Sequence, residues 1–287
     1  MNKDNDIRDR KDLSGEEILS LNFINDSGPY WFRKYYRSGL RSHIFEVLLA
    51  KDVLQEVNGI MEDGILVFPR ARPKKVFRIF RSHFKTTAKI FHEIEKYNIL
   101  IDILGPDLIA LSEEFIVDYT GAKEHHMLLC GLQEYIEGEI LDPWKIFSNT
   151  YLEELYDSLP RNNVTQAGFV QTARKDIEIF STKIRQIIIE KGYIPDLAGI
   201  GNLILSHKGK LKLVDINNIV TINFEDTIPI DDKGYPSCDV SVHVLFILET
   251  RILQKNPHED DPLYRFFLSP ERKQKVKMLE RQFYANL

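Results

Sequence analysis

Cysteine is scarce in this chain of 287 residues, which has Cys130, Cys238 and no others. The two lie far apart and neither has a partner at CxxC spacing, so the sequence predicts neither a disulfide framework nor a zinc site. A reduced, cytoplasmic setting therefore fits best. Long apolar runs are also missing, and stretches such as 187–189 and 244–248 are far too short to cross a bilayer. We therefore expect no membrane insertion.

An excess of positive charge is missing as well. The formal net charge is −5, which gives the whole molecule no general attraction for nucleic acid. The charged N-terminus has no apolar segment of the kind found in signal peptides, and we expect the tail of residues 1–28 to be partly disordered. Hydrophobic residues make up 43% of the chain, which is enough for a sizeable core without stabilisation by disulfides or metal ions.

The N-terminal half reads as strands interrupted by one or two helices. Residues rich in aromatic or β-branched side chains predict strands over 29–37, 65–68, 76–80, 115–119 and 127–135. A helix is expected over 42–56. A second is expected over 85–104, where apolar side chains recur at Ile90, Ile94, Tyr97, Ile101 and Leu104 with the period of one helix face.

After Gly138 the pattern changes to one dominated by helices. Helices are expected over 143–159, 172–191, 240–253 and 270–283, with two short strands over 203–206 and 211–215. The sequence therefore predicts an α+β fold in two lobes. We expect an N-lobe over residues 29–138, built on an antiparallel sheet with a helix, and a mostly helical C-lobe over 139–287.

The segment from Tyr193 to Ile219 carries the clearest chemical pattern. An irregular loop presents Asp196, Asn202 stands at the mouth of a hairpin, and Asp215 ends the second strand of that hairpin. Mg²⁺ takes oxygen ligands, usually one or two carboxylates together with phosphate and water. A rigid hairpin could supply an amide oxygen and a carboxylate, and a further carboxylate could orient a hydroxyl nucleophile. Taken singly, such residues are ordinary turn formers.

This segment resembles the catalytic segment of the protein-kinase-like superfamily, especially its small bacterial members related to aminoglycoside phosphotransferases. Asp196-Leu197 resembles the family's catalytic Asp-Leu, and Asn202 to Leu205 resembles its Asn-Ile-Leu stretch. Lys212 to Asp215 resembles the strand that ends in the metal-binding Asp. The resemblance implies a bilobal kinase-like fold, with Asp196 as catalytic base and Asn202 and Asp215 as Mg²⁺ ligands.

The same resemblance assigns the nucleotide contacts. Backbone groups of Glu134 and Ile136 would hold the adenine of ATP at a hinge. The phosphate-binding cation falls on Arg78, with Arg81 and Lys34 as alternatives. Its acidic partner on the helix over 85–104 would be Glu93 or, as second choice, Glu95, and Asp239 would brace the catalytic loop.

Departures from the family pattern keep two functions open. Asp196 and Asn202 are six positions apart, one more than is usual in the family, Ile194 replaces a His, and there is no Gly-rich loop near the start. The first expectation is a Mg²⁺-dependent phosphotransferase that moves the γ-phosphate of ATP to a hydroxyl on a small molecule or a protein. The alternative is a pseudokinase that binds a nucleotide or a protein partner without catalysis. A weaker third is a domain that kept only the fold.

Overall fold

A computed structural model describes residues 6–24, 28–36, 39–121, 124–160, 163–256 and 261–285. The chain divides into two compact units. The sheet unit comprises Met1–Ile94 and Leu111–Tyr135, and the helical unit comprises Glu95–Ala110 and Ile136–Leu287. The fold is therefore α+β. No helix within the described ranges is both long and apolar enough to cross a membrane.

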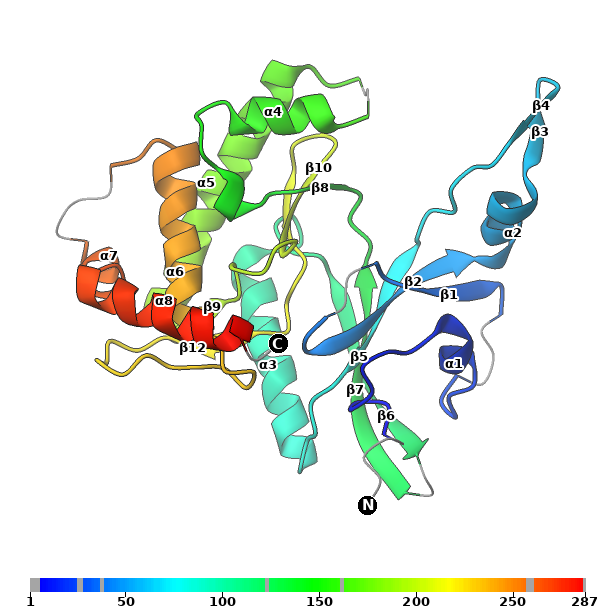
Figure 1. The fold of residues 1–287 in the computed structure, drawn as a ribbon, viewed down its shortest axis with the longest axis horizontal. Coiled ribbons are helices and arrows are strands. Elements are labelled where there is room, and N and C mark those ends of the chain that lie inside the picture. Colours follow the sequence, from blue (N-terminus) through cyan, green and yellow to red (C-terminus); the bar gives the residue numbers. More distant parts are fainter. Residues whose placement is uncertain are drawn as a thin grey trace. The chain divides into compact units, whose positions relative to one another are not determined.

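The sheet unit is built on five antiparallel strands in the order β1-β2-β5-β7-β6 (Figure 1). The strands are β1 (Tyr30–Lys34), β2 (Ser42–Leu49), β5 (Lys75–Phe80), β6 (Ser112–Gly121) and β7 (Glu124–Glu134). The helix predicted over 42–56 is wrong in its first half, where β2 pairs with β1 and β5, and α2 (Ala50–Asn58) begins only afterwards. Sheet pairing on both sides overrides the local pattern, because β2 is nearly all buried.

The N-terminal segment covers one face of this sheet. Ile7, Leu13 and Ile18 are buried there, in one apolar cluster with Phe77 and Ile79 of β5. The segment includes the short helix α1 (Gly15–Leu19), which begins with a capping box between Ser14 and Glu17. The disorder expected from the charged composition therefore does not extend over this part of the tail, since three well-spaced apolar residues anchor it.

The helix α3 (Thr87–Leu104) buries part of its apolar stripe against the opposite face of the sheet. Ile90 forms a separate cluster with Phe80 of β5 and Leu129 of β7. Alternate residues of a strand point to opposite faces, so Arg78 lies on the same face as Phe80. The helix predicted over 85–104 is confirmed, and its residues from Glu95 onward belong to the helical unit.

A small hairpin follows α2 and forms a two-stranded sheet of its own among the described residues. It consists of β3 (Ile60–Glu62) and β4 (Ile65–Val67). Asp63 and Gly64 between the strands have φ angles of 48° and 80°, as a type I′ turn requires.

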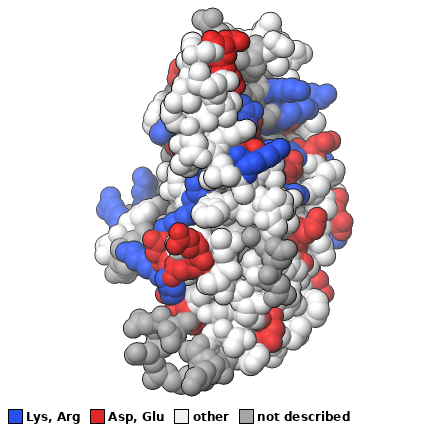
Figure 2. Space-filling model, turned by 90° about the vertical axis from the view of Figure 1, so that its right-hand side faces the viewer, with Lys and Arg blue, Asp and Glu red and all other residues white. Residues whose placement is uncertain are grey.

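Figure 2 shows acidic and basic side chains interspersed on the face drawn there, so neither sign of charge dominates that face.

The helical unit is organised around α5 (Gln166–Lys191) and α6 (Ser237–Ile247), which carry much of its core. Its other helices are η2 (Pro143–Lys145), α4 (Tyr151–Ser158), η3 (Leu248–Ile252), α7 (Pro262–Phe267) and α8 (Pro270–Ala285). The helix predicted over 143–159 is broken into η2 and α4. The end of α5 agrees with the sequence, because Gly192 adopts a left-handed conformation there with φ of 68°.

The strands of the helical unit are short. One sheet has the order β11-β10-β8, formed by β8 (Gly138–Ile140), β10 (Leu203–Ser206) and β11 (Leu211–Leu213). A separate ladder joins β9 (Tyr193–Pro195) to β12 (Ile219–Thr221). The hairpin β10–β11 was predicted. Three-residue strands such as β8, β9 and β12 carry too little periodicity to be found in a sequence.

Candidate functional site

The loop from Asp196 to Asn218, called here the acid loop, is closed at its base by the β9–β12 ladder. Asp196 directly follows β9 and Asn218 directly precedes β12, so antiparallel pairing brings the two residues together. The backbone N–H of Asp196 donates to the carbonyl of Asn218 at 2.8 Å. All three residues expected at the catalytic segment lie on this loop, within the helical unit.

The carboxylate of Asp196 is buried and held on both oxygens. It is 6% exposed. Its Oδ1 accepts the backbone N–H of Ala198 at 2.9 Å, and its Oδ2 accepts the side-chain amide of Asn218 at 3.0 Å. Burying a charge is costly unless hydrogen bonds compensate, and these two bonds do so. The carboxylate is therefore fixed in one orientation.

The side chain of Asn202 is tied to Asp196 through its amide nitrogen. Its Nδ2 donates to the backbone carbonyl of Asp196 at 2.9 Å. The backbone N–H of Asn202 donates to the carbonyl of Gly199 at 3.0 Å, which closes the intervening turn. Among the residues that the structure describes, no hydrogen bond occupies Oδ1 of Asn202. That amide oxygen is therefore available as a ligand.

The β10–β11 hairpin brings Asp215 to the same end of the loop. Leu203 is paired with Leu213, and the ladder extends one step further because the N–H of Val214 donates to the carbonyl of Asn202 at 2.8 Å. Asp215 is the next residue and is half-buried. Its Oδ1 accepts the N–H of Asn217 at 3.1 Å. Asn202 is thus hydrogen-bonded both to Asp196 and to Val214, the residue directly before Asp215.

Helix α6 braces the acid loop through residues that the sequence did not single out. The N–H of Leu197 donates to Oγ of Ser241 at 3.0 Å, and the amide of Asn218 also donates to Oγ of Ser237 at 3.1 Å. Ser237 in turn donates to Asp231. Serine and asparagine are common everywhere in a chain, so no sequence signal marked these three as supports.

Asp239 has a different role from the one expected of it. Its carboxylate forms a buried ion pair with Arg272 of α8, with Nε–Oδ1 and Nη2–Oδ2 distances of 2.5 and 3.1 Å. Burial raises the pKa of Asp239, and Arg272 opposes that rise. The bracing of the loop therefore comes from the serines of α6, whereas Asp239 joins α6 to α8.

Arg78 has an acidic partner that the sequence did not indicate. It is 3% exposed, and its Nη2 donates to Glu114 Oε1 on β6 at 2.7 Å and to Ser112 at 3.1 Å. Gly131 of β7 lies between the two strands, and a Cβ there would meet the Glu114 carboxylate at 2.8 Å. Burial raises the pKa of Glu114 against the attraction of Arg78. Glu93 lies half-buried on α3, and Glu95 is exposed.

The alternative cations contact the N-terminal segment. Arg81 donates from Nε to the carbonyl of Arg8 at 2.9 Å, and Lys34 forms an ion pair with Asp12. All three candidate cations of the sheet unit therefore have partners within that unit.

The predicted hinge residues fall on either side of the unit boundary. Glu134 ends β7 in the sheet unit, where its N–H donates to the carbonyl of Leu111 at 2.7 Å. Ile136 opens the long part of the helical unit. The two units meet along the chain between Tyr135 and Ile136, which is three residues before the boundary expected between residues 138 and 139.

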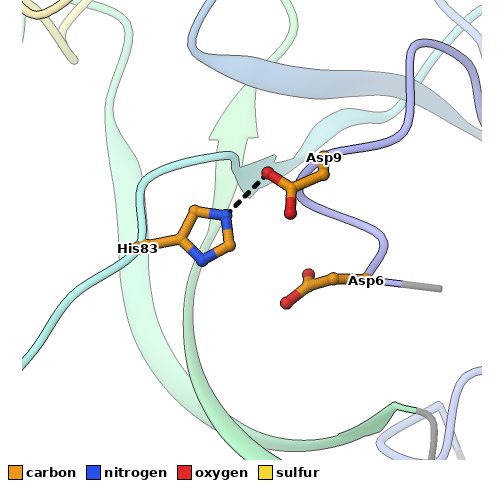
Figure 3. Close-up of side chains that lie close together, drawn as sticks. All are labelled: Asp6, Asp9 and His83. Atoms are coloured by element: carbon orange, nitrogen blue, oxygen red, sulfur yellow. Dashed lines mark hydrogen bonds and ion pairs between the residues drawn. The ribbon is translucent and has the colours of Figure 1, made fainter. Parts of the chain in front are cut away.

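A second group of potential ligands lies at the N-terminal segment. Figure 3 shows Asp6, Asp9 and His83 close together, with a hydrogen bond of 2.8 Å between His83 Nε2 and Asp9 Oδ1. Asp6 is already paired with Arg8, whose Nη2 lies 2.5 Å from its Oδ2. That guanidinium opposes a further cation at the same carboxylate. The group therefore serves to attach the N-terminal segment to the chain after β5.

The acid loop carries two oxygen ligands of the kinds that hard divalent cations take. It presents an amide oxygen and a carboxylate at one end of a rigid hairpin, and Mg²⁺ prefers oxygen ligands of both kinds. No protein-family model matches the chain, and no curated protein matches it. Any assignment of function therefore depends on the contacts of the loop itself.

Proposed function

We propose that the chain is a kinase-like phosphotransferase, which moves the γ-phosphate of ATP to a hydroxyl acceptor with the help of Mg²⁺. The observation that carries the proposal is the hydrogen bond from Asn202 Nδ2 to the carbonyl of Asp196. This bond commits the nitrogen end of the amide to the loop and leaves the oxygen end for a cation. A bilobal kinase-like arrangement, an adenine held by backbone groups at Glu134 and Ile136, and a cytoplasmic location are parts of the same proposal.

Asn202 and Asp215 would hold the metal. Their available atoms are a neutral amide oxygen and a carboxylate, which suit Mg²⁺ and leave positions for phosphate and water. The cation would neutralise charge on the phosphate oxygens. The ladder bond between Val214 and Asn202 keeps the two ligands on adjoining strands, so neither has to be ordered when the cation binds.

Asp196 would orient the acceptor hydroxyl and take its proton. The bonds from Ala198 and Asn218 would hold its carboxylate in one orientation toward that hydroxyl. The acceptor itself, a small molecule or a protein, is recognised by other residues.

A nucleotide-binding pseudokinase is the second candidate, and the same carboxylate favours it. Asp196 is almost fully buried, and both of its oxygens are bound within the loop. In the sheet unit Arg78 is buried against Glu114, so its guanidinium has a structural partner already. A carboxylate and a cation in structural roles would support binding without turnover.

Thermal unfolding of the full chain with ATP, in the presence and absence of Mg²⁺, tests binding. Nucleotide at about 100 times its Kd stabilises a protein by roughly 2.7 kcal/mol. We expect Mg²⁺-dependent stabilisation in the wild type and its loss in Asn202→Ala and Asp215→Asn. Asp226→Asn is the matched control, because Asp226 is exposed in the segment between β12 and α6, outside the acid loop, and its substitution makes the same change in charge as Asp215→Asn.

Turnover then separates the two candidates. Release of phosphate from ATP, or its transfer to an acceptor, should disappear in Asp196→Asn if the chain is a phosphotransferase. Stabilisation by ATP and Mg²⁺ without any turnover supports the pseudokinase. Stabilisation that is absent, or equal in Asp215→Asn and the wild type, contradicts metal binding by the acid loop and with it both candidates.

A further inference from the structure

The helical unit contains a cavity that the proposed phosphotransfer does not use. Its volume is about 430 Å³, within the range of small-molecule sites, and η2, α6, α7 and α8 all contribute to its walls. Every lining residue belongs to the helical unit, so the cavity is complete within that unit.

Aromatic side chains form much of the wall. Trp144, Tyr235, Phe267 and Tyr284 all line the cavity. The rings of Tyr235 and Tyr284 lie 6.3 Å apart, and the Trp144 ring meets the edge of His243 at 5.7 Å. Such faces bind flat molecules by stacking and edge contacts. The occupant is therefore expected to be planar.

The charges in the wall favour an anion. Lys273 and Lys277 line the cavity from α8, and among the described residues neither has a carboxylate within ion-pair distance. Asp239 is balanced by Arg272. Glu280 accepts the hydroxyl of Tyr235 at 2.8 Å and is the one acid of the wall without a basic partner there. The wall thus carries two lysines and one carboxylate that has no basic partner there.

His243 adds a hydrogen-bonding group without adding charge. Burial, assisted by Lys273, Arg251 and Lys277, lowers the pKa of His243 to about 4. At neutral pH its imidazole therefore has one donor and one acceptor nitrogen. A polar substituent on a planar molecule could use either.

We propose that this cavity binds a small planar molecule that carries one anionic group, a carboxylate, sulfonate or phosphate. The aromatic wall would hold the plane, and Lys273 with Lys277 would hold the anion. The inference does not depend on phosphotransfer, because it concerns the helical unit without nucleotide.

Trp144 gives the cavity a built-in reporter. Its indole N–H donates to the carbonyl of Ala198 at 3.1 Å, so the ring is held in place by the acid loop. The chain has 2 tryptophans, and the other, Trp31, lies in the sheet unit and is 40% exposed. In a Trp31→Phe background, tryptophan fluorescence reports on Trp144 alone.

The test is a fluorescence titration of that variant with anilinonaphthalene sulfonate, an anion with a planar naphthalene ring, and with its uncharged analogue phenylnaphthylamine. We expect the anion to quench Trp144 at saturable concentrations. Lys273→Gln with Lys277→Gln should raise its Kd about tenfold or more, since each lost charged contact is worth that much. The same double change should alter the Kd of the uncharged analogue little.

Lys275→Gln is the matched control, because Lys275 is exposed on the same helix and does not line the cavity. Unchanged far-UV circular dichroism shows that each variant is folded. Probe binding without quenching of Trp144 places the probe elsewhere and overturns the proposal. An equal effect of Lys275→Gln and the double change overturns it too, because the anion would then respond to the overall charge of α8.

Discussion

The two units of this protein use their charged residues in opposite ways. In the sheet unit, the residue expected to bind phosphate also forms a buried ion pair, between Arg78 and Glu114. In the helical unit, the buried ion pair and the proposed ligands are different residues. Asp239 and Arg272 form the buried ion pair, while Asn202 and Asp215 keep oxygen atoms available at the end of the acid loop.

This difference decides which substitutions are informative. A change at Asn202 or Asp215 tests binding without removing a buried charge pair. A change at Arg78 tests stability first, because it leaves Glu114 buried without its cation. The largest change in the free energy of unfolding is therefore expected at Arg272, which has no proposed function. Substitutions that weaken ligand binding should change the free energy of unfolding only slightly.

The largest effect is expected for Arg272→Met. Asp239 is 2% exposed and would lose Arg272, its one cationic partner among the described residues, so the free energy of unfolding should fall by about 3–5 kcal/mol. Urea unfolding of the full chain, followed by circular dichroism, measures this. Adding Asp239→Leu should restore most of the loss, since no buried charge then remains. A loss below about 1 kcal/mol would show that the pair is not desolvated.

Arg78→Met should cost about 3 kcal/mol at pH 8 and less at pH 5. Burial already raises the pKa of Glu114 above its unfolded value, and loss of Arg78 raises it further. A group of this kind contributes stability below its unfolded pKa that is lost as the pH rises through the folded pKa. Unfolding in urea at both pH values gives the comparison, and Glu114→Gln in the same background should remove the pH dependence.

Gly199→Ala should impair nucleotide binding more than folding. A Cβ at this position would lie 2.6 Å from the amide atoms of Asn202, so that side chain must move and its bond to Asp196 must break. We expect Mg²⁺-dependent stabilisation by ATP to weaken at least tenfold in apparent Kd, which corresponds to about 1.4 kcal/mol. The stability without nucleotide should change by less than about 1 kcal/mol.

Gly168→Ala is the control for this glycine substitution, because it lies in the first turn of α5 and a Cβ there meets Thr165 Oγ1 at 3.2 Å. If Gly199→Ala binds ATP and Mg²⁺ as the control does, the orientation of the Asn202 amide does not matter for binding.

The smallest effect is expected for His243→Gln. The pKa of His243 is lowered to about 4, whereas an unfolded histidine titrates near 6.5. Between these values the unfolded chain binds more protons, so stability falls as the pH drops from 6.5 toward 4. Between pH 6.5 and pH 4, the free energy of unfolding should fall by about 1 kcal/mol less in the variant than in the wild type, allowing for partial solvent screening. Identical profiles of Tm against pH for variant and wild type would contradict the assignment.

Local sequence was sufficient where one element could bury a periodic apolar face. Helix α3 and the hairpin β10–β11 were predicted close to their observed bounds, and the end of α5 at Lys191 was predicted, although α5 begins at Gln166 and not at Thr172. It was insufficient for β2, where the apolar residues Ile44, Val47 and Leu48 suggested a helix and two neighbouring strands imposed a sheet. Charge dominates the composition of the N-terminal segment, so the burial of Ile7, Leu13 and Ile18 against the sheet was not indicated by the sequence.

The candidate site shows the same division. The order of Asp196, Asn202 and Asp215 along the chain, and the hairpin between the last two, could be predicted because both depend on neighbouring residues. The supports of the loop, Ser241 and Asn218, and the pairing of Arg78 with Glu114 could not, because each joins segments far apart in the sequence.

By itself the sequence determined the α+β composition, the long helices and the hairpin that carries an amide and a carboxylate to one end. These follow from periodicity and turn chemistry over short stretches of chain. Only the tertiary structure decided that Arg78 is buried against Glu114, that Asp239 pairs with Arg272, and that Asn202 turns its nitrogen toward Asp196. The partner of a buried polar group is whichever group the fold brings within reach, and distance along the chain does not predict it.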